Sequence, residues 1–225
     1  MEKSQFVQDS VTFKNELLIY GSQLTDEIDK LERSSDSHRA YYGYLKDFLI
    51  SSGCLCDDVL LASVNDAVLL AMIGTRVLLE DTINVHYLEK AKTTETERVA
   101  LAEDWLKMSN DKHAQKNELD GKSVAERAKA AGKDVRQLYY NEYEMFCNYT
   151  HSSAQRSILS SSEHRSLGSK KTVLASLQAY ANIVICVARI VEQKVPEKLT
   201  TAANIYFETY REAVSQATLP ITEEL

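Results

Sequence analysis

The segment VLLASVNDAVLLAMIGTRVLLEDTINVHYL, residues 59–88, carries the strongest structural signal in the chain. Leucine, valine, alanine and isoleucine occupy nearly every side of a helix drawn through it, and a helix that is apolar on all sides is buried on all sides. We therefore expect residues 57–90 to form one central, buried helix. Gly74 within it costs about 1 kcal/mol relative to alanine, which indicates that a neighbouring helix packs closely there.

Composition extends this interpretation to the whole chain. The 225 residues include only seven glycines and two prolines, too few for the many turns of a strand-rich domain. Hydrophobic residues make up 44%, close to the globular norm, so the chain can bury a sizeable core. We expect residues 1–225 to form a single all-α domain, a helical bundle of about seven to eight helices.

Helical periodicity and capping signals place the other elements. An N-terminal helical hairpin, residues 1–52, is expected from helices at 4–32 and 38–51, the second ended by Gly53. Capping boxes, in which a helix's first polar residue and the third helical residue bond each other's backbone, predict three further starts. These boxes are Thr94/Glu97, Ser123/Glu126 and Asp134/Gln137, and their helices are expected to end near Lys116, at Gly132 and at His151.

The C-terminal part is expected to begin with a loop. Residues 151–170 hold eight serines, and we predict that they form the most mobile internal segment. Helices are expected at 171–193 and 197–217, with Pro196 at a first helical position.

The charge and the cysteines indicate which partners and which cellular compartment to expect. The formal charge of −7 argues against a generally basic nucleic-acid binder. Residues 121–171, however, contain nine Lys/Arg and five Asp/Glu, a net of +4 that is either a local anion-facing surface or ordinary scatter. The four cysteines lack C-x-x-C spacing and the first residues lack the apolar core of a signal peptide, which predicts a cytoplasmic protein. The longest uncharged run, 172–188, is short for a membrane span, so no membrane association is expected.

Few residues stand out as candidates for a catalytic, binding or metal site. The histidines show no metal-ligand spacing with each other or with cysteine, so no metal and no cofactor is expected. Arg76 and Glu80 lie four residues apart on the buried helix and must pair or serve a polar cavity, either as a structural ion pair or as a site wall. His151 follows the tyrosines of YYNEYEMFCNY, residues 139–149, and is either a structural hydrogen-bonding residue or a working group.

Several of these features, taken in order, resemble a family of bacterial all-α proteins catalogued as a domain of unknown function. They are Arg76-x3-Glu80, the segment GKSVAERAKAAG at 121–132, and the tyrosines followed by His151. The resemblance covers roughly residues 60–195. The sequence departs from the family pattern at Leu119, where an aromatic is expected, and at Cys147, where serine is usual.

That family resembles in turn the HEPN superfamily, whose helical members include metal-independent ribonucleases and non-catalytic partners in defence systems. The resemblance implies a HEPN-like core at about 57–195 that binds or cleaves RNA in a bacterial or phage-linked defence or stress system. RNA would contact residues 121–171. In catalysis, His151 would act as general acid and base, Arg76 or Arg156 would stabilise the phosphorane, and Glu80 would orient one of them.

Two readings stay open at the level of sequence. The first is the metal-independent endoribonuclease. The second is a non-enzymatic partner or sensor with a structural Arg-Glu-His cluster, which forms a homodimer or binds a partner protein of the defence system. The HEPN-type spacing of an arginine and a histidine occurs only at Arg33 and His38, where about one chance match is expected. Both readings place His151 within hydrogen-bonding or one-water reach of Arg76 or Glu80.

Overall fold

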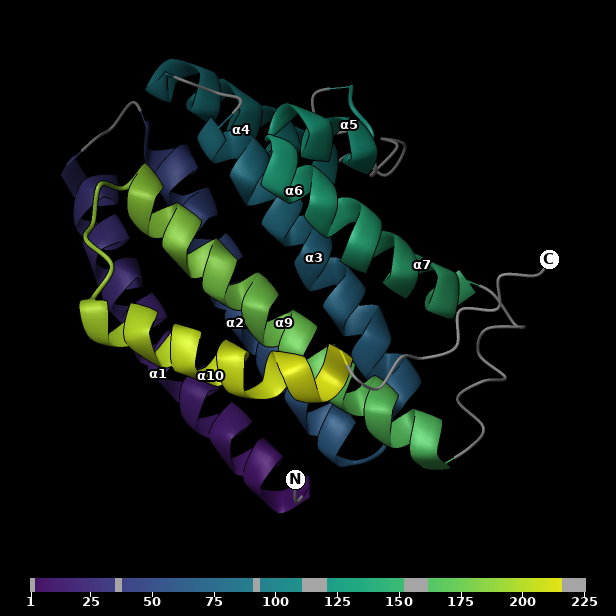
Figure 1. The fold of residues 1–225 in the computed structure, drawn as a ribbon. Coiled ribbons are helices and arrows are strands. Elements are labelled where there is room, and N and C mark those ends of the chain that lie inside the picture. The colour runs from purple at the N-terminus through teal and green to yellow at the C-terminus, as the bar shows by residue number, and fades with distance from the viewer. Residues whose placement is uncertain (1–2, 35–37, 91–93, 111–120, 152–161, 216–225) are drawn as a thin grey trace.

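A computed structural model describes residues 3–34, 38–90, 94–110, 121–151 and 162–215 (Figure 1). Every regular element in these ranges is helical, and no strand occurs within them, so the all-α prediction is confirmed. The elements are α1 (Lys3–Ser34), α2 (Arg39–Val64), α3 (Val68–Lys90), α4 (Glu95–Asn110), α5 (Val124–Ala130), α6 (Lys133–Leu138), the π-helix η2 (Tyr139–Tyr143), α7 (Glu144–His151), α9 (Ser162–Ile190) and α10 (Glu197–Ser215).

The bundle is built around α3 and α9, which share the most extensive contact in the fold. Helix α2 packs against both, α1 covers α2 and α9, and α10 crosses α9 and α1 (Figure 1). On the opposite flank, α5, η2 and α7 lie along α3. Helix α3 therefore has neighbours on three sides, and this arrangement positions the side chains considered below.

The expected single helix at 57–90 is wrong, because the chain turns between α2 and α3. Asp66 takes a left-handed conformation, with φ 57°. The amide of Ala67 donates to Ala62 O at 2.9 Å and that of Asp66 to Ser63 O at 3.4 Å, which is the Schellman pattern of a helix end. Asn and Asp tolerate the left-handed region better than other non-glycine residues. The Asn65–Asp66 pair therefore ends α2 inside an apolar segment.

Gly53 does not end a helix as expected. Helix α2 continues through it, so the boundary between hairpin 1–52 and core 57–195 falls within one helix. A Cβ at Gly53 would lie 2.8 Å from the Tyr180 hydroxyl, so the glycine permits a close approach by α9. Gly74 has the predicted packing role, since a Cβ there would lie 2.6 Å from Val59 Cγ2 of α2.

Two of the three capping boxes are confirmed. Thr94 and Glu97 bond each other ahead of α4, and Ser123 and Glu126 do so ahead of α5. The third is wrong, because α6 begins at Lys133 behind Gly132, which has φ 114° and no side-chain cap. Gly132 thus both separates α5 from α6 and opens α6.

The serine-rich segment is partly helical. Helix α9 begins at Ser162, nine residues before the expected start, while residues 152–161 lie outside the described ranges. Ser169 is buried and its hydroxyl donates to Ser63 O at 3.1 Å, so a small polar side chain here joins α9 to the last turn of α2. Helix α10 starts at Glu197, the residue after Pro196, whose carbonyl accepts from the Leu199 amide.

Helices α3 and α9 run parallel with a constant register. The Thr75 hydroxyl approaches Thr172 O at 3.4 Å, and the Thr82 hydroxyl approaches Ala179 O at 3.1 Å. Both pairs are 97 residues apart in sequence, and they are separated by seven residues, or two helical turns. We call these contacts the threonine ladder. The next position in the same register pairs Glu89 with Cys186.

One segment, Gly168–Ile190 in α9, is long and apolar enough to cross a membrane, and 78% of its most apolar window is buried inside the bundle. The core helix of an α-bundle has the same properties, because neighbouring helices surround it.

Candidate functional site

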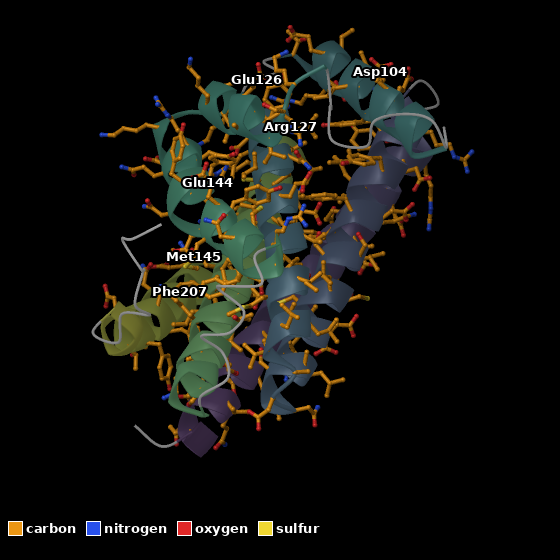
Figure 2. All side chains as sticks on the ribbon, turned by 90° about the vertical axis from the view of Figure 1, so that its right-hand side faces the viewer. Asp104, Glu126, Arg127, Glu144, Met145 and Phe207 are labelled. Atoms are coloured by element: carbon orange, nitrogen blue, oxygen red, sulfur yellow. The ribbon has the colours of Figure 1, made fainter. Side chains whose placement is uncertain are left out.

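The predicted site residues on α3 face the flank formed by α5, η2 and α7. Glu80 Oε1 lies 3.5 Å from Arg127 Nη2 of α5, and its Oε2 accepts from the Tyr143 hydroxyl at 3.2 Å. Arg76 places its guanidinium carbon 5.9 Å from the centroid of the same tyrosine ring. We call Arg76, Glu80, Arg127 and Tyr143 the arginine–glutamate cluster. Figure 2 views the molecule from this flank.

Arg127 reaches the cluster because of the capping box in front of it. Ser123 and Glu126 fix the first turn of α5, and Arg127 follows directly, pointing toward α3. Its Nη1 donates to Lys122 O at 2.6 Å, and the residue is only 1% exposed. A buried guanidinium requires both an opposite charge and hydrogen-bond acceptors, and Glu80 and the Lys122 carbonyl supply them.

The π-helix positions the tyrosine of the cluster. One wider turn at Tyr139–Tyr143 shifts the side chains that follow, and such turns occur frequently at functional sites. Tyr139 and Tyr143 stack with ring centroids 5.4 Å apart. Tyr143 is buried and faces Glu80, whereas Tyr140 points outward and is 51% exposed. The tyrosine-rich stretch therefore has an inner and an outer face.

Burial and neighbouring charges shift the pKa values of Tyr143 and Arg127 in the cluster. Burial, followed by the neighbouring Glu80 carboxylate, raises the pKa of Tyr143, so its hydroxyl remains a donor. Burial lowers the pKa of Arg127, and Glu80 opposes that shift. Asp81 follows Glu80 in the sequence, but its side chain lies beside Ser52 of α2. Burial and then Glu80 raise the pKa of Asp81 to about 7, so this carboxyl titrates near neutrality.

The sequence predicted that Arg76 and Glu80 pair or serve a polar cavity, and their actual partners differ. Glu80 pairs with Arg127, while Arg76 has no carboxylate within ion-pair distance among the described residues. Arg76 Nε is buried without a hydrogen-bond acceptor. Arg127 belongs to the GKSVAERAKAAG motif but was not selected from sequence, because only the fold shows that it points inward.

The other candidates fall partly outside the described part of the chain. The backbone of His151 closes α7, but its side chain lies outside the described residues, as does all of Arg156, so their predicted contacts remain predictions. Helix α7 runs antiparallel to α3, since Cys147, one turn after Tyr143, lies beside Arg76. This direction carries the His151 backbone away from Glu80. His38 Nδ1 lies 3.1 Å from Glu95, which gives that histidine a structural partner.

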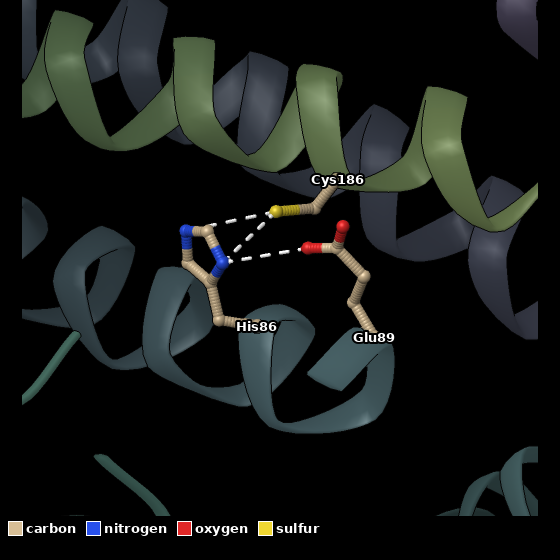
Figure 3. Close-up of side chains that lie close together, drawn as sticks. All are labelled: His86, Glu89 and Cys186. Atoms are coloured by element: carbon tan, nitrogen blue, oxygen red, sulfur yellow. Dashed lines mark hydrogen bonds and ion pairs between the residues drawn. The ribbon is translucent and has the colours of Figure 1, made fainter. Parts of the chain in front are cut away.

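A second cluster was missed in the sequence. His86 and Glu89 of α3 meet Cys186 of α9 (Figure 3). His86 Nδ1 is 3.2 Å from Cys186 Sγ and 3.5 Å from Glu89 Oε2. The spacing His86-x-x-Glu89 signals that both side chains share one helix face. Cys186 could be added only with the α3–α9 register, which no local pattern reveals.

The chemistry of this cluster differs from that of a nucleophilic site. Cys186 is 0% exposed, and burial, then the Glu89 charge, raises its thiol pKa, so the sulfur is protonated and unreachable by a substrate. Burial alone would raise the pKa of Glu89, but His86, Cys186 and Arg189 together lower it to about 2. The carboxylate is therefore charged at neutral pH.

No family model, no curated protein and no solved structure matches the chain.

Proposed function

We propose that this protein is a HEPN-like helical protein of a bacterial or phage-linked defence or stress system, and that it binds RNA on the α5–η2–α7 flank. Arg76 is the residue that carries the proposal. Its buried Nε has no hydrogen-bond acceptor, and its guanidinium has no carboxylate partner among the described residues. The guanidinium can therefore bind a phosphate as its counter-charge.

The surroundings of Arg76 favour a planar, immobilised guanidinium. Its contact with the Tyr143 ring is a cation–π arrangement, and Tyr143 is itself held by Glu80. We assign Glu80 and Arg127 a positioning role. They fix Tyr143, and Tyr143 fixes Arg76. A phosphate oxygen would then bind an Arg76 guanidinium whose side chain is already held in place, so binding costs less side-chain entropy.

Further groups on the flank suit a single-stranded nucleic acid. Tyr140 is half exposed and lies under the Arg136 guanidinium, 5.7 Å from ring centroid to carbon. Exposed aromatic rings stack bases, and nearby cations bind the backbone. Lys171 of α9 extends toward α7, with its Nζ 3.7 Å from Met145 Sδ. These positions agree with the net positive charge of residues 121–171.

Cleavage is the stronger form of the same proposal. His151 would move the proton of the ribose 2′-hydroxyl, and Arg76 or Arg156 would stabilise the phosphorane charge. These would be the catalytic residues, with Glu80 acting only through its neighbours.

One observation favours the non-enzymatic alternative, in which the cluster is structural. Both oxygens of Glu80 are engaged, and Arg127 is sealed from solvent. A cluster of this kind ties α5 and η2 to α3 whether or not RNA binds. The experiments must therefore separate stability from binding.

The binding test compares Arg76→Gln with Arg39→Gln. Arg39→Gln is a matched control, since this substitution removes the same charge from an exposed position near Glu32. Fluorescence anisotropy with single-stranded RNA at several salt concentrations should show at least a tenfold affinity loss and a smaller salt slope for Arg76→Gln only. Equal losses in both variants, or no binding by the parent at low salt, would overturn the proposal.

The cleavage test uses His151→Ala and Glu80→Gln, with RNA cleavage and melting temperature measured on each. Lost cleavage with an unchanged melting temperature supports catalysis by His151. A parent that binds RNA without cutting it limits the function to binding. Lowered stability of the two variants, together with a parent that neither binds nor cuts RNA, supports the structural alternative.

A further inference from the structure

The cluster of His86, Glu89 and Cys186 contains a buried acceptor that forms no hydrogen bond. Glu89 Oε2 is buried and forms no hydrogen bond, and its one close contact is His86 Nδ1 at the long ion-pair distance of 3.5 Å. The other oxygen, Oε1, is held by Arg189 Nη1 at 3.3 Å. A buried charged oxygen that accepts no hydrogen bond is costly, so a further group is expected to satisfy it.

Two of the three distances between the donor atoms match those around a tetrahedral metal. Zinc bonds of about 2.3 Å to sulfur and about 2.0–2.2 Å to nitrogen or oxygen place neighbouring ligand atoms roughly 3.3–3.6 Å apart. Nδ1 lies 3.2 Å from Sγ and 3.5 Å from Oε2, and all the donor atoms lie within 4.8 Å of one another. Only small side-chain shifts separate these positions from a coordination shell.

We propose that His86, Glu89 and Cys186 bind one Zn²⁺ ion, with water in the fourth position. The combination of thiolate, imidazole and carboxylate favours zinc over Mg²⁺ or Ca²⁺, which prefer oxygen ligands alone. Binding releases the thiol proton to solvent and leaves a thiolate and a carboxylate beside a divalent cation. The coordinated group is then neutral, which limits the cost of burying it.

The site has both an entry side and a support. Cys186 is wholly enclosed, but His86 and Glu89 each keep a small exposed fraction, 12% and 15% of the side chain. Water and metal reach the cluster from that side. Arg189 supports the carboxylate from outside, as outer groups do in metal sites. The ion would join the last turns of α3 to α9, where the threonine ladder stops.

The test is metal uptake by the full chain after treatment with a chelator. The parent should bind one equivalent of Zn²⁺, and Co²⁺ in its place should show a thiolate-to-metal charge-transfer band. With free zinc about 100-fold above Kd, the melting temperature should rise by about 5–10 °C. Cys186→Ser should lose the charge-transfer band and most of the zinc-dependent rise.

Cys56→Ser is the matched control. Cys56 is equally buried, and its thiol faces Ser176 O of the same helix α9, outside the cluster. This variant should keep the full zinc response. His86→Gln, at a partly exposed position, is the second disruptive variant if Cys186→Ser does not fold. No stoichiometric uptake by the parent, or equal uptake by the parent and His86→Gln, would refute the site.

Discussion

Two sides of α3 pack against neighbouring helices through different polar groups, neutral hydroxyls on one side and charged side chains on the other. Toward α9, buried Thr75 and Thr82 contact backbone carbonyls, and no charge is buried until the last turn. Toward α5 and η2, Glu80 meets Arg127 and Tyr143. Neutral hydroxyls permit close helix contact at little desolvation cost, whereas charges require a complete set of partners. The charged side should therefore be the more sensitive to mutation.

The largest effect is expected on the charged side. Arg127→Ala should destabilise the protein by about 3–5 kcal/mol, because it leaves Glu80 without its cation in a partly buried position. Urea unfolding followed by circular dichroism measures the loss. The double variant Glu80→Leu/Arg127→Met should recover much of it, and a double variant as unstable as the single one would show that the cluster contributes more than its ion pair.

Asp81, which lies beside Ser52 of α2, should make the stability depend on pH on a further side of α3. Its folded pKa of about 7 is raised above the unfolded value, so the folded state binds the extra proton and stability falls as pH rises from about 4 through 7. Asp81→Asn removes this loss and should stabilise the protein at pH 8 by about 2–4 kcal/mol, with little change at pH 4. Parallel pH-stability curves for parent and variant would contradict the shifted pKa.

A substitution at Gly74 tests the packing of α3 against α2, its third neighbour, without changing any charge. Alanine there would press against Val59 of α2, and overpacking costs typically 1–3 kcal/mol. The gain in helix propensity from glycine to alanine returns about 1 kcal/mol. We expect a net loss of up to about 2 kcal/mol that does not change with pH, measured by thermal unfolding. Gly43→Ala, where the nearest atom is Glu32 Oε1 at 3.7 Å, is the control.

The smallest effect is expected on the neutral side. Thr82→Val keeps the shape of the side chain and removes only its hydroxyl, so the loss should be about 0.5–1.5 kcal/mol. Hydrogen exchange of α9 amides near Ala179 should report it locally. A loss as large as that of Arg127→Ala would erase the distinction between the two sides.

Signals that act within a few residues were readable from the sequence. Ser123 with Glu126, and Thr94 with Glu97, predicted two helix starts correctly, and the shortage of glycine and proline predicted the fold class. The turn at Asn65–Asp66 was hidden because the apolar residues on both sides fit one continuous helix. Arg127 and Cys186 could not be assigned, since their roles depend on how α5 and α9 align with α3.

The register of α3 against α9 has a consequence for synthesis on the ribosome. The contact between Thr75 and Thr172 can form only after the ribosome has added the 97 residues that separate them. Translation at roughly 5–20 residues per second makes that delay about 5–20 s. During this interval α3 has emerged beside α2 but lacks the helix that covers its other apolar side. Parallel pairing of distant segments also slows folding itself. The nascent chain is thus a candidate client for chaperones that shield apolar helices until the C-terminal third is made.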